Sequence, residues 1–125
     1  MKKYFFLITL ILTLIISCAS STNEIKDITV NDLQLVLKNN KNTQLVDVRT
    51  PDEWAEGVIE NAIKINVTAT DFESISLQKL DKEKPVYIYC RSGGRSKIAS
   101  EILSKKGFHC YNVLGGYMAW KEKNN

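Results

Sequence analysis

Short apolar runs alternate with helical patterns along the chain from residue 28 onward. Runs rich in Val, Ile and Tyr predict strands, whereas apolar residues three or four positions apart predict amphipathic helices. Regular alternation of the two is typical of a parallel sheet with crossover helices. The predicted strands are 28–29, 44–48, 62–67, 85–90 and 110–114. The pattern therefore predicts an α/β fold with a parallel sheet.

Helix starts are marked by capping residues. Thr50 stands three residues before Glu53, and Thr70 stands three residues before Glu73, which predicts a capping box at each place. Asn31 is expected to cap an earlier helix. A further helix follows Cys90 and is expected to end at Gly107, with an apolar face made of Ile98, Ala99, Ile102 and Leu103.

The first 17 residues have the organisation of a signal peptide. Lys2 and Lys3 precede an unbroken run of apolar residues and Thr at 4–16, and small residues follow. A permanent transmembrane helix is the alternative, but this run of 13 residues is shorter than the roughly 20 that a spanning helix needs. Export is therefore expected.

Residues 15–18, Ile-Ile-Ser-Cys, resemble the lipobox of bacterial lipoproteins, in which the cysteine becomes the acylated first residue after cleavage. The resemblance implies that Cys18 carries lipid and anchors the protein to a bacterial membrane, facing the periplasm if the cell has two membranes. The polar residues that follow are typical of a tether. The expected organisation is a signal peptide at 1–17, a lipidated cysteine and tether at 18–27, and one domain at 28–125.

Composition and charge narrow the function classes. A chain of 125 residues has room for a single domain. Removal of Lys2 and Lys3 from the 17 basic residues leaves 15 against 14 acidic residues, so no nucleic-acid partner is expected. His109 is the only histidine, and no two cysteines are separated by two residues, so we expect no metal site. A monomer without a cofactor is expected.

The candidate chemistry lies where strand 85–90 ends on Cys90. Ligands of parallel α/β sheets bind at the carboxyl ends of the strands. Gly93 and Gly94 allow successive N–H groups to converge on an anion at the start of a helix, a setting that lowers the pKa of a thiol. No acidic residue occurs between Glu83 and Glu101. The cations in that window are Lys84, Arg91, Arg95 and Lys97. This loop is therefore expected to bind small anions.

Residues 90–96, Cys-Arg-Ser-Gly-Gly-Arg-Ser, look like the active-site loop of single-domain rhodaneses, the thiosulfate sulfurtransferase family. Further matches in the same order extend the resemblance over 28–122, at 45–49, 51–54, 107–108, 111–116 and 119–120. The resemblance implies a central, mostly parallel five-stranded sheet with helices on both faces. The chain departs from the family's pattern at Val58, where His is usual, and at 60–61, where Pro-Gly is usual.

The resemblance also implies a mechanism. The Cys90 thiolate would take a sulfur from a small anionic donor such as thiosulfate and pass it from a persulfide to cyanide or a thiol. The residues implied to bind the donor are Arg91, Ser92, Gly93, Gly94, Arg95 and Ser96. Asp47 and Arg49 are expected to support the loop, and we interpret Arg49 as the ion-pair partner of Glu53.

Two other functions remain open. Arsenate reductases and cysteine phosphatases place an arginine six residues after the cysteine, whereas position 96 here is Ser. A sulfur-binding or interaction module with little turnover is the second alternative, although such modules usually lack the cysteine.

Cys90 and Cys110 are not expected to form a disulfide, because opposite ends of parallel strands put them roughly 16 Å apart.

Overall fold

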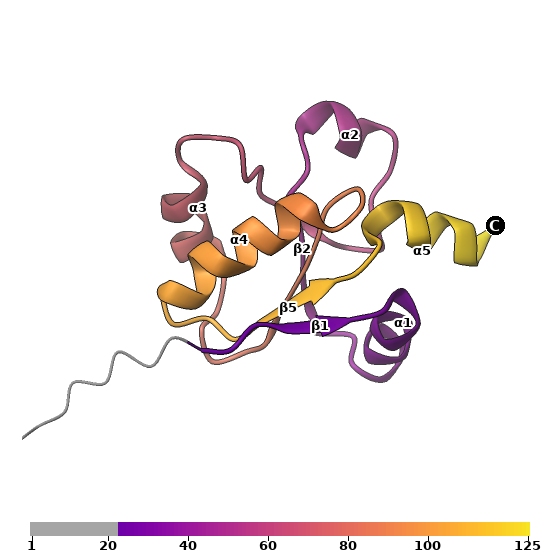
Figure 1. Ribbon diagram of the computed structural model, residues 1–125, viewed down its shortest axis with the longest axis horizontal. Helices are drawn as coiled ribbons and strands as arrows, with labels where there is room; N and C mark the ends of the chain where they lie inside the picture. The colour runs from indigo at the N-terminus through magenta and orange to yellow at the C-terminus, as the bar shows by residue number, and fades with distance from the viewer. Residues whose placement is uncertain (1–22) are drawn as a thin grey trace, which may run out of the picture.

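The computed structural model describes residues 23–125. The predicted signal peptide and Cys18 lie outside the described residues. Five parallel strands form one sheet in the order β1-β5-β4-β2-β3 (Figure 1). The strands are β1 Lys26–Ile28, β2 Gln44–Asp47, β3 Ile63–Lys64, β4 Val86–Tyr89 and β5 Cys110–Val113. The helices are α1 Val30–Asn39, α2 Pro51–Ala55, α3 Phe72–Lys79, α4 Gly94–Lys105 and α5 Gly116–Asn124. The predicted α/β fold is confirmed.

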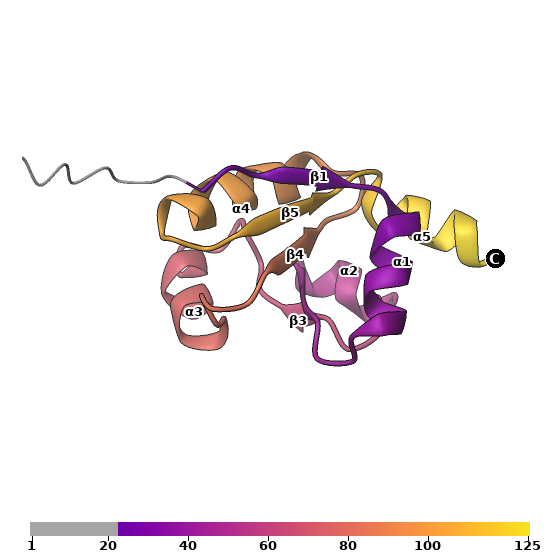
Figure 2. The same cartoon turned by 90° about the horizontal axis from the view of Figure 1, so that it is seen from below.

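Alternating strand residues separate the interior into two cores, one on each face of the sheet. Val46, Ile88 and Cys90 belong to the first core, which includes residues of α3 and α4. Leu45 and Tyr89 belong to the second, which includes residues of α1, with Tyr117 and Trp120 of α5 packed against it. Figure 2 shows the two groups of helices on either side of the strands. Period-two alternation along each strand produces this division.

Two of the predicted helix starts are wrong. Helix α1 begins at Val30, and its capping box is formed by Thr29 and Asp32 rather than by Asn31. Asp32 is long enough to accept the Thr29 N–H, at 3.3 Å, so aspartate serves where glutamate is usual. Helix α3 begins one residue after Asp71, and no side chain caps it. The box at Thr50 and Glu53 is present.

The buried stripe of α4 also differs from the predicted face. Ile98 is 55% exposed, whereas Ala99 and Leu103 are buried as expected. The rest of the stripe is Ser96, Ser100 and Ser104. These small residues allow the helix to lie close to the sheet, and the Ser100 hydroxyl is satisfied by the Ser96 carbonyl at 2.7 Å. Hydroxyls that bond within their own helix can be buried, which an apolar-face rule misses.

The two cysteines of the described chain lie at opposite ends of neighbouring strands. Cys110 pairs with Val86 at the start of β4, and Cys90 follows the end of that strand. The four steps from Val86 to Cys90 span about 13 Å, well beyond the Cα limit of about 7 Å for a disulfide. Both thiols are free, as predicted.

Strand β1 includes Lys26 and Asp27, two residues that the sequence assigned to the tether. It pairs with β5, and upstream of it the Asn23 amide donates to the carbonyls of Gly107 and Phe108. The chain is thus joined to the sheet from its first described residue. Within residues 23–125 no helix is both long and apolar enough to cross a membrane.

Helix α5 begins directly against the loop that carries Cys90. The Tyr117 N–H donates to the Cys90 carbonyl at 2.8 Å, and the Met118 N–H donates to the Arg91 carbonyl at 3.0 Å. Gly116 has a φ of 54°, and a Cβ there would meet the Cys90 carbonyl oxygen and lie 2.8 Å from that of Arg91. Only a residue without a side chain permits this contact.

Gly116→Ala should therefore destabilise the protein by at least about 2 kcal/mol, because the left-handed backbone and the backbone clash add together. Urea unfolding followed by circular dichroism measures the change. Gly94→Ala is the matched control, since nothing lies within 4 Å of a Cβ added there. Equal stability of the two variants would contradict the requirement for glycine where α5 meets the loop.

Candidate active site

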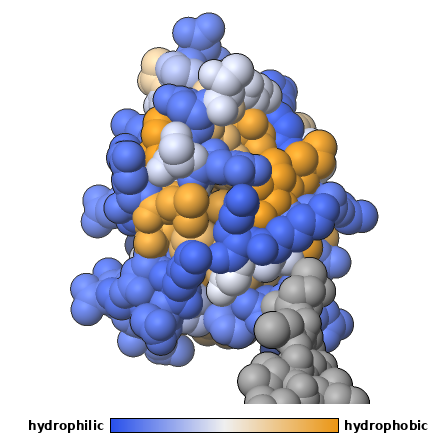
Figure 3. All heavy atoms as spheres, turned by 90° about the vertical axis from the view of Figure 1, so that its left-hand side faces the viewer, coloured by the Kyte–Doolittle hydropathy of each residue, from blue (hydrophilic) through white to orange (hydrophobic). Residues whose placement is uncertain are grey.

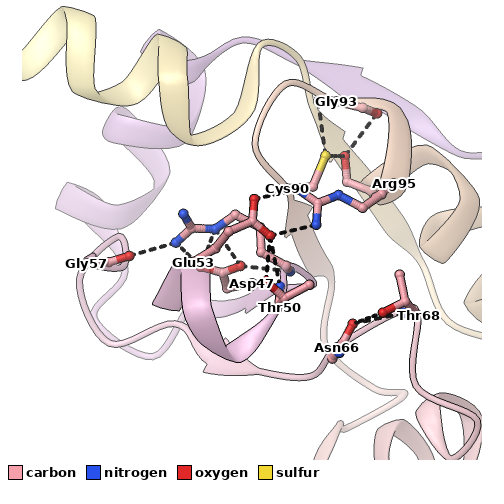
Figure 4. Close-up of polar contacts among 11 residues, drawn as sticks. Asp47, Thr50, Glu53, Gly57, Asn66, Thr68, Cys90, Gly93 and Arg95 are labelled. Carbon is pink, nitrogen blue, oxygen red and sulfur yellow. Dashed lines mark hydrogen bonds and ion pairs between the residues drawn. The ribbon is translucent and has the colours of Figure 1, made fainter. Parts of the chain in front are cut away.

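Cys90 lies between the end of β4 and the start of α4, at the carboxyl edge of the sheet (Figure 4). Its side chain is almost fully buried, with 1% of the residue exposed. Gly93 adopts a left-handed φ of 115°, which turns the loop so that its N–H donates to the Cys90 sulfur at 3.1 Å. The hydroxyl of Ser96, in the first turn of α4, lies 3.4 Å from the same sulfur. The loop therefore wraps around the thiol.

The two buried thiols have opposite electrostatic environments. Burial raises the pKa of Cys90, but hydrogen bonds from the Ser96 side chain and from the backbone of Ser96, Gly93 and Ser92 outweigh it, and the net pKa is lowered. Cys110 has burial alone, which raises its pKa to about 12. Because the thiolate is the nucleophilic form, Cys90 is the thiol suited to chemistry.

The predicted donor-binding residues are distributed unevenly around the sulfur. Gly93 and Ser96 contact it, while Arg91 and Ser92 are exposed on the loop and Gly94 begins α4. Arg91 makes no ion pair with any residue in 23–125. Its charge is therefore available to an anion that approaches the loop.

Arg95 forms the ion pair with Glu53 that the sequence assigned to Arg49. Both terminal nitrogens of Arg95 lie 2.7 Å from the two carboxylate oxygens, a bidentate arrangement visible in Figure 4. Glu53 also accepts the Thr50 N–H at 3.1 Å. Hydrogen bonding from Arg95, opposed by burial and aided by Thr50, lowers the pKa of Glu53 to about 2. This pair joins the loop side of α4 to helix α2.

Arg49 instead pairs with Asp47, two residues earlier. Its guanidinium is 2.7 Å from Asp47 Oδ2 and 2.7 Å from the Gly57 carbonyl, and both members of the pair are buried. The Tyr117 ring lies over the guanidinium at 4.1 Å. The prediction of an Arg49 pair with Glu53 is wrong because the Asp47 carboxylate is nearer and shares its buried setting. Through Tyr117, whose N–H binds the Cys90 carbonyl, the pair contacts the helix that holds the loop.

Three residues of the site were not identified from the sequence: Asn112, Gly116 and Tyr117. Asn112 is a buried polar residue in a strand whose pattern is otherwise apolar, and it lies 2.6 Å from the Ser96 hydroxyl. Gly116 follows another glycine at a helix start. An isolated polar residue in a core strand could have identified Asn112, and a pair of glycines before a helix could have identified Gly116.

Two surface depressions accompany these elements. One of about 100 Å³ lies beside the loop and is lined by Arg49, Glu53, Glu56, Arg91, Tyr117, Met118 and Lys121. The other, of about 320 Å³, lies between α3 and α4 and is lined by Glu73, Ile98, Glu101, Ile102, Lys105 and Lys106. Figure 3, which views the molecule from the α3 side, shows hydrophobic residues interrupted by hydrophilic ones. Only the first depression adjoins the Cys90 loop.

Glu53→Gln should destabilise the protein by about 1 kcal/mol at pH 7, because it removes a partly buried bidentate ion pair. The folded pKa of about 2 lies below the ordinary value of 4.5, so the stabilisation is present above pH 4.5 and is lost as the pH falls toward 2. Urea unfolding at pH 7 and near pH 2 tests this. Glu56→Gln, at an exposed residue without an ion pair in the described chain, is the control. A loss for Glu53→Gln that is equally large at both pH values would contradict the argument.

Comparison with known proteins agrees with this geometry. The family described as Rhodanese-like domain matches residues 29–123. The chain is 37% identical over 98 residues to Bacillus subtilis YtwF, whose name gives it a provisional assignment as a sulfurtransferase; 78% of this chain and 92% of YtwF are covered. It is 36% identical over 78 residues to the thiosulfate sulfurtransferase GlpE of Coxiella burnetii, covering 62% and 70% of the two chains. A crystal structure of a rhodanese-like domain protein from Staphylococcus aureus superposes with a TM-score of 0.69 at 39% identity, covering 76% of this chain and 90% of that one. The chain belongs to the rhodanese-like domain family.

Proposed function

We propose that the chain is a sulfurtransferase that moves a sulfane sulfur from an anionic donor such as thiosulfate to a thiol or cyanide, through a persulfide on Cys90. The observation that carries the proposal is the loop itself, which presents the Gly93 N–H and the Ser96 hydroxyl to a buried thiol of lowered pKa. The Coxiella burnetii relative is named a thiosulfate sulfurtransferase, which supports the choice of donor.

The proposed reaction has two displacement steps. The Cys90 thiolate attacks the outer sulfur of thiosulfate, the sulfur–sulfur bond of the donor breaks, and its electron pair leaves with sulfite. A persulfide anion remains on Cys90. An acceptor thiolate or cyanide then attacks the outer sulfur of the persulfide, and the electron pair of that bond returns to Cys90 as thiolate. The Gly93 N–H, a hydrogen-bond donor fixed in the loop, favours the anionic form of the Cys90 sulfur.

Arg91 is the proposed first contact of the donor. It is exposed, it lines the depression beside the loop together with Lys121, and its guanidinium is free of ion pairs within residues 23–125. Arg95 lies in the first turn of α4 but shares its charge with Glu53. Ser92 and Gly94 complete the proposed donor-binding loop. The charges of Arg91 and Lys121 beside the loop raise the local concentration of a small anion.

A thiosulfate labelling experiment tests the proposal. Intact mass should show one added sulfur on the wild type and on Cys110→Ser, because the Cys110 thiol is buried at the other end of the sheet. Cys90→Ser should gain none and should form no thiocyanate, since a hydroxyl stays protonated where a thiolate is needed.

The low exposure of Cys90 favours one alternative, a sulfur-binding or interaction module with little turnover. A sulfur on Cys110, or on neither cysteine, would replace the transferase proposal with that module. A phosphatase would have an arginine six residues after the cysteine, whereas position 96 here is Ser.

We also propose that Cys18 is lipidated after removal of residues 1–17 and anchors the protein to the outside of a bacterial membrane. The support is the sequence at 15–18 and the basic, apolar run before it. Cys18→Ala should move the protein from the detergent phase to the aqueous phase in a detergent partition experiment, because each buried methylene contributes roughly 0.8 kcal/mol to membrane binding. Retention in the detergent phase with full acylation would refute the anchor.

A further inference from the structure

A line of polar contacts runs from the sulfur of Cys90 to strand β1. The sulfur lies 3.4 Å from the Ser96 hydroxyl, which lies 2.6 Å from Asn112 Oδ1. The Nδ2 of Asn112 lies 3.5 Å from Asp27 Oδ1. Ser96 and Asn112 are buried, so bulk water does not replace these partners. Asp27 and Asn112 are register partners in β1 and β5, which brings their side chains together.

The Ser96 hydroxyl has one proton to donate. Its contact with Asn112 Oδ1 is shorter than its 3.1 Å contact with the Gly93 carbonyl, so in this geometry the proton points to Asn112. The hydroxyl then presents a lone pair to Cys90, an arrangement that suits a protonated thiol. A thiolate can only accept a hydrogen bond. Ionisation of Cys90 therefore favours a turn of the Ser96 proton from Asn112 to the sulfur.

We propose that Asn112 is a positioning residue that competes with the Cys90 sulfur for the proton of Ser96, and that Asp27 holds the Asn112 amide in the competing orientation. If the amide turned over, Nδ2 would donate to Ser96 and the Ser96 proton would be free for the sulfur. Oδ1 would then face the Asp27 carboxylate, which opposes the turn. The Asp27 contact thus keeps Asn112 an acceptor.

This competition has a use if the proposed sulfur transfer is correct. The negative charge is on the Cys90 sulfur before attack and on the outer sulfur once the persulfide forms. The Ser96 proton can follow that change by pointing to the sulfur in the first state and returning to Asn112 in the second. No proton leaves the site in either half of the cycle.

Several charged groups also belong to the elements around the site: Asp47 at the end of β2, Arg49 two residues after it, Glu53 of α2, Arg91 of the loop and Arg95 of α4. Asp47 pairs with Arg49 and Glu53 pairs with Arg95, while Arg91 has no ion pair within residues 23–125. None of the five forms a hydrogen bond with the Ser96 or Asn112 side chains. Substitutions at Asn112 should therefore leave their contribution unchanged.

The test is the pH dependence of Cys90 alkylation by iodoacetamide in the full chain in detergent, followed by peptide mass spectrometry. Asn112→Leu keeps the volume but removes the acceptor, so the apparent pKa of Cys90 should fall by about 0.5 to 1 unit. Ser96→Ala removes the donor and should raise it by a similar amount. Ser100→Ala, one turn along α4 and without contact to the sulfur, should leave it unchanged.

The sign of the change decides the proposal. If Asn112 only props up Ser96, its loss misplaces the hydroxyl and the pKa of Cys90 rises or stays the same, which overturns the proposal. Should Asn112→Leu fail to fold, Asp27→Asn at the exposed strand decides instead. Asp27→Asn should lower the pKa of Cys90, and the fall should persist in 1 M salt, where the electrostatic screening length is on the order of 3 Å. An unchanged pKa overturns the proposal. Alkylation needs no sulfur donor, so the outcome is independent of whether the protein transfers sulfur.

Discussion

A buried sulfur that must carry negative charge is the constraint on which the rest of the structure depends. Removal from water raises the pKa of a thiol, so the site needs hydrogen-bond donors that stay in place without solvent. The loop supplies the Gly93 N–H through its left-handed turn, and α4 supplies the Ser96 hydroxyl, which can turn its proton from Asn112 to the thiolate. The parallel sheet makes this possible because it delivers Cys90 and the start of α4 to the same edge. Cys110, equally buried but without such donors, shows the effect of burial alone.

The hydrogen-bond donors around the Cys90 sulfur keep their positions only if the loop is held in place. Helix α5 holds the loop by donating two backbone N–H groups to the carbonyls of Cys90 and Arg91, and Gly116 lets the two backbones approach. The buried pair of Asp47 and Arg49 lies under the same helix, with Tyr117 over the guanidinium. Removing either member would leave a buried charge without its partner, which is strongly unfavourable. The Asp47–Arg49 pair therefore supports helix α5 where that helix holds the loop.

Much of this could be predicted from the sequence, and the errors over which side chains pair with each other have one physical cause. Strands, the loop and the position of Cys90 follow from local periodicity and from glycines that fix backbone conformation, so local rules identify them. Choice of partner depends on distances between segments, which local rules do not contain. Glu53 lies four residues after Arg49 in sequence, yet α4 brings Arg95 to it. The contact of Asp27 with Asn112 likewise depends on the pairing of the first strand with the last.

The pairing of Glu53 with Arg95 rather than with Arg49 bears directly on how the proposed sulfur donor would reach Cys90. Because the pKa of Glu53 is about 2, this carboxylate stays ionised across the neutral range and protonation does not release Arg95. An incoming anion must therefore share Arg95 with Glu53 or replace it, in competition with two hydrogen bonds of 2.7 Å. Arg91 has no such competitor among the described residues. In this arrangement Arg91 is suited to capturing the proposed donor, while Arg95 with Glu53 would form the wall against which that donor is placed.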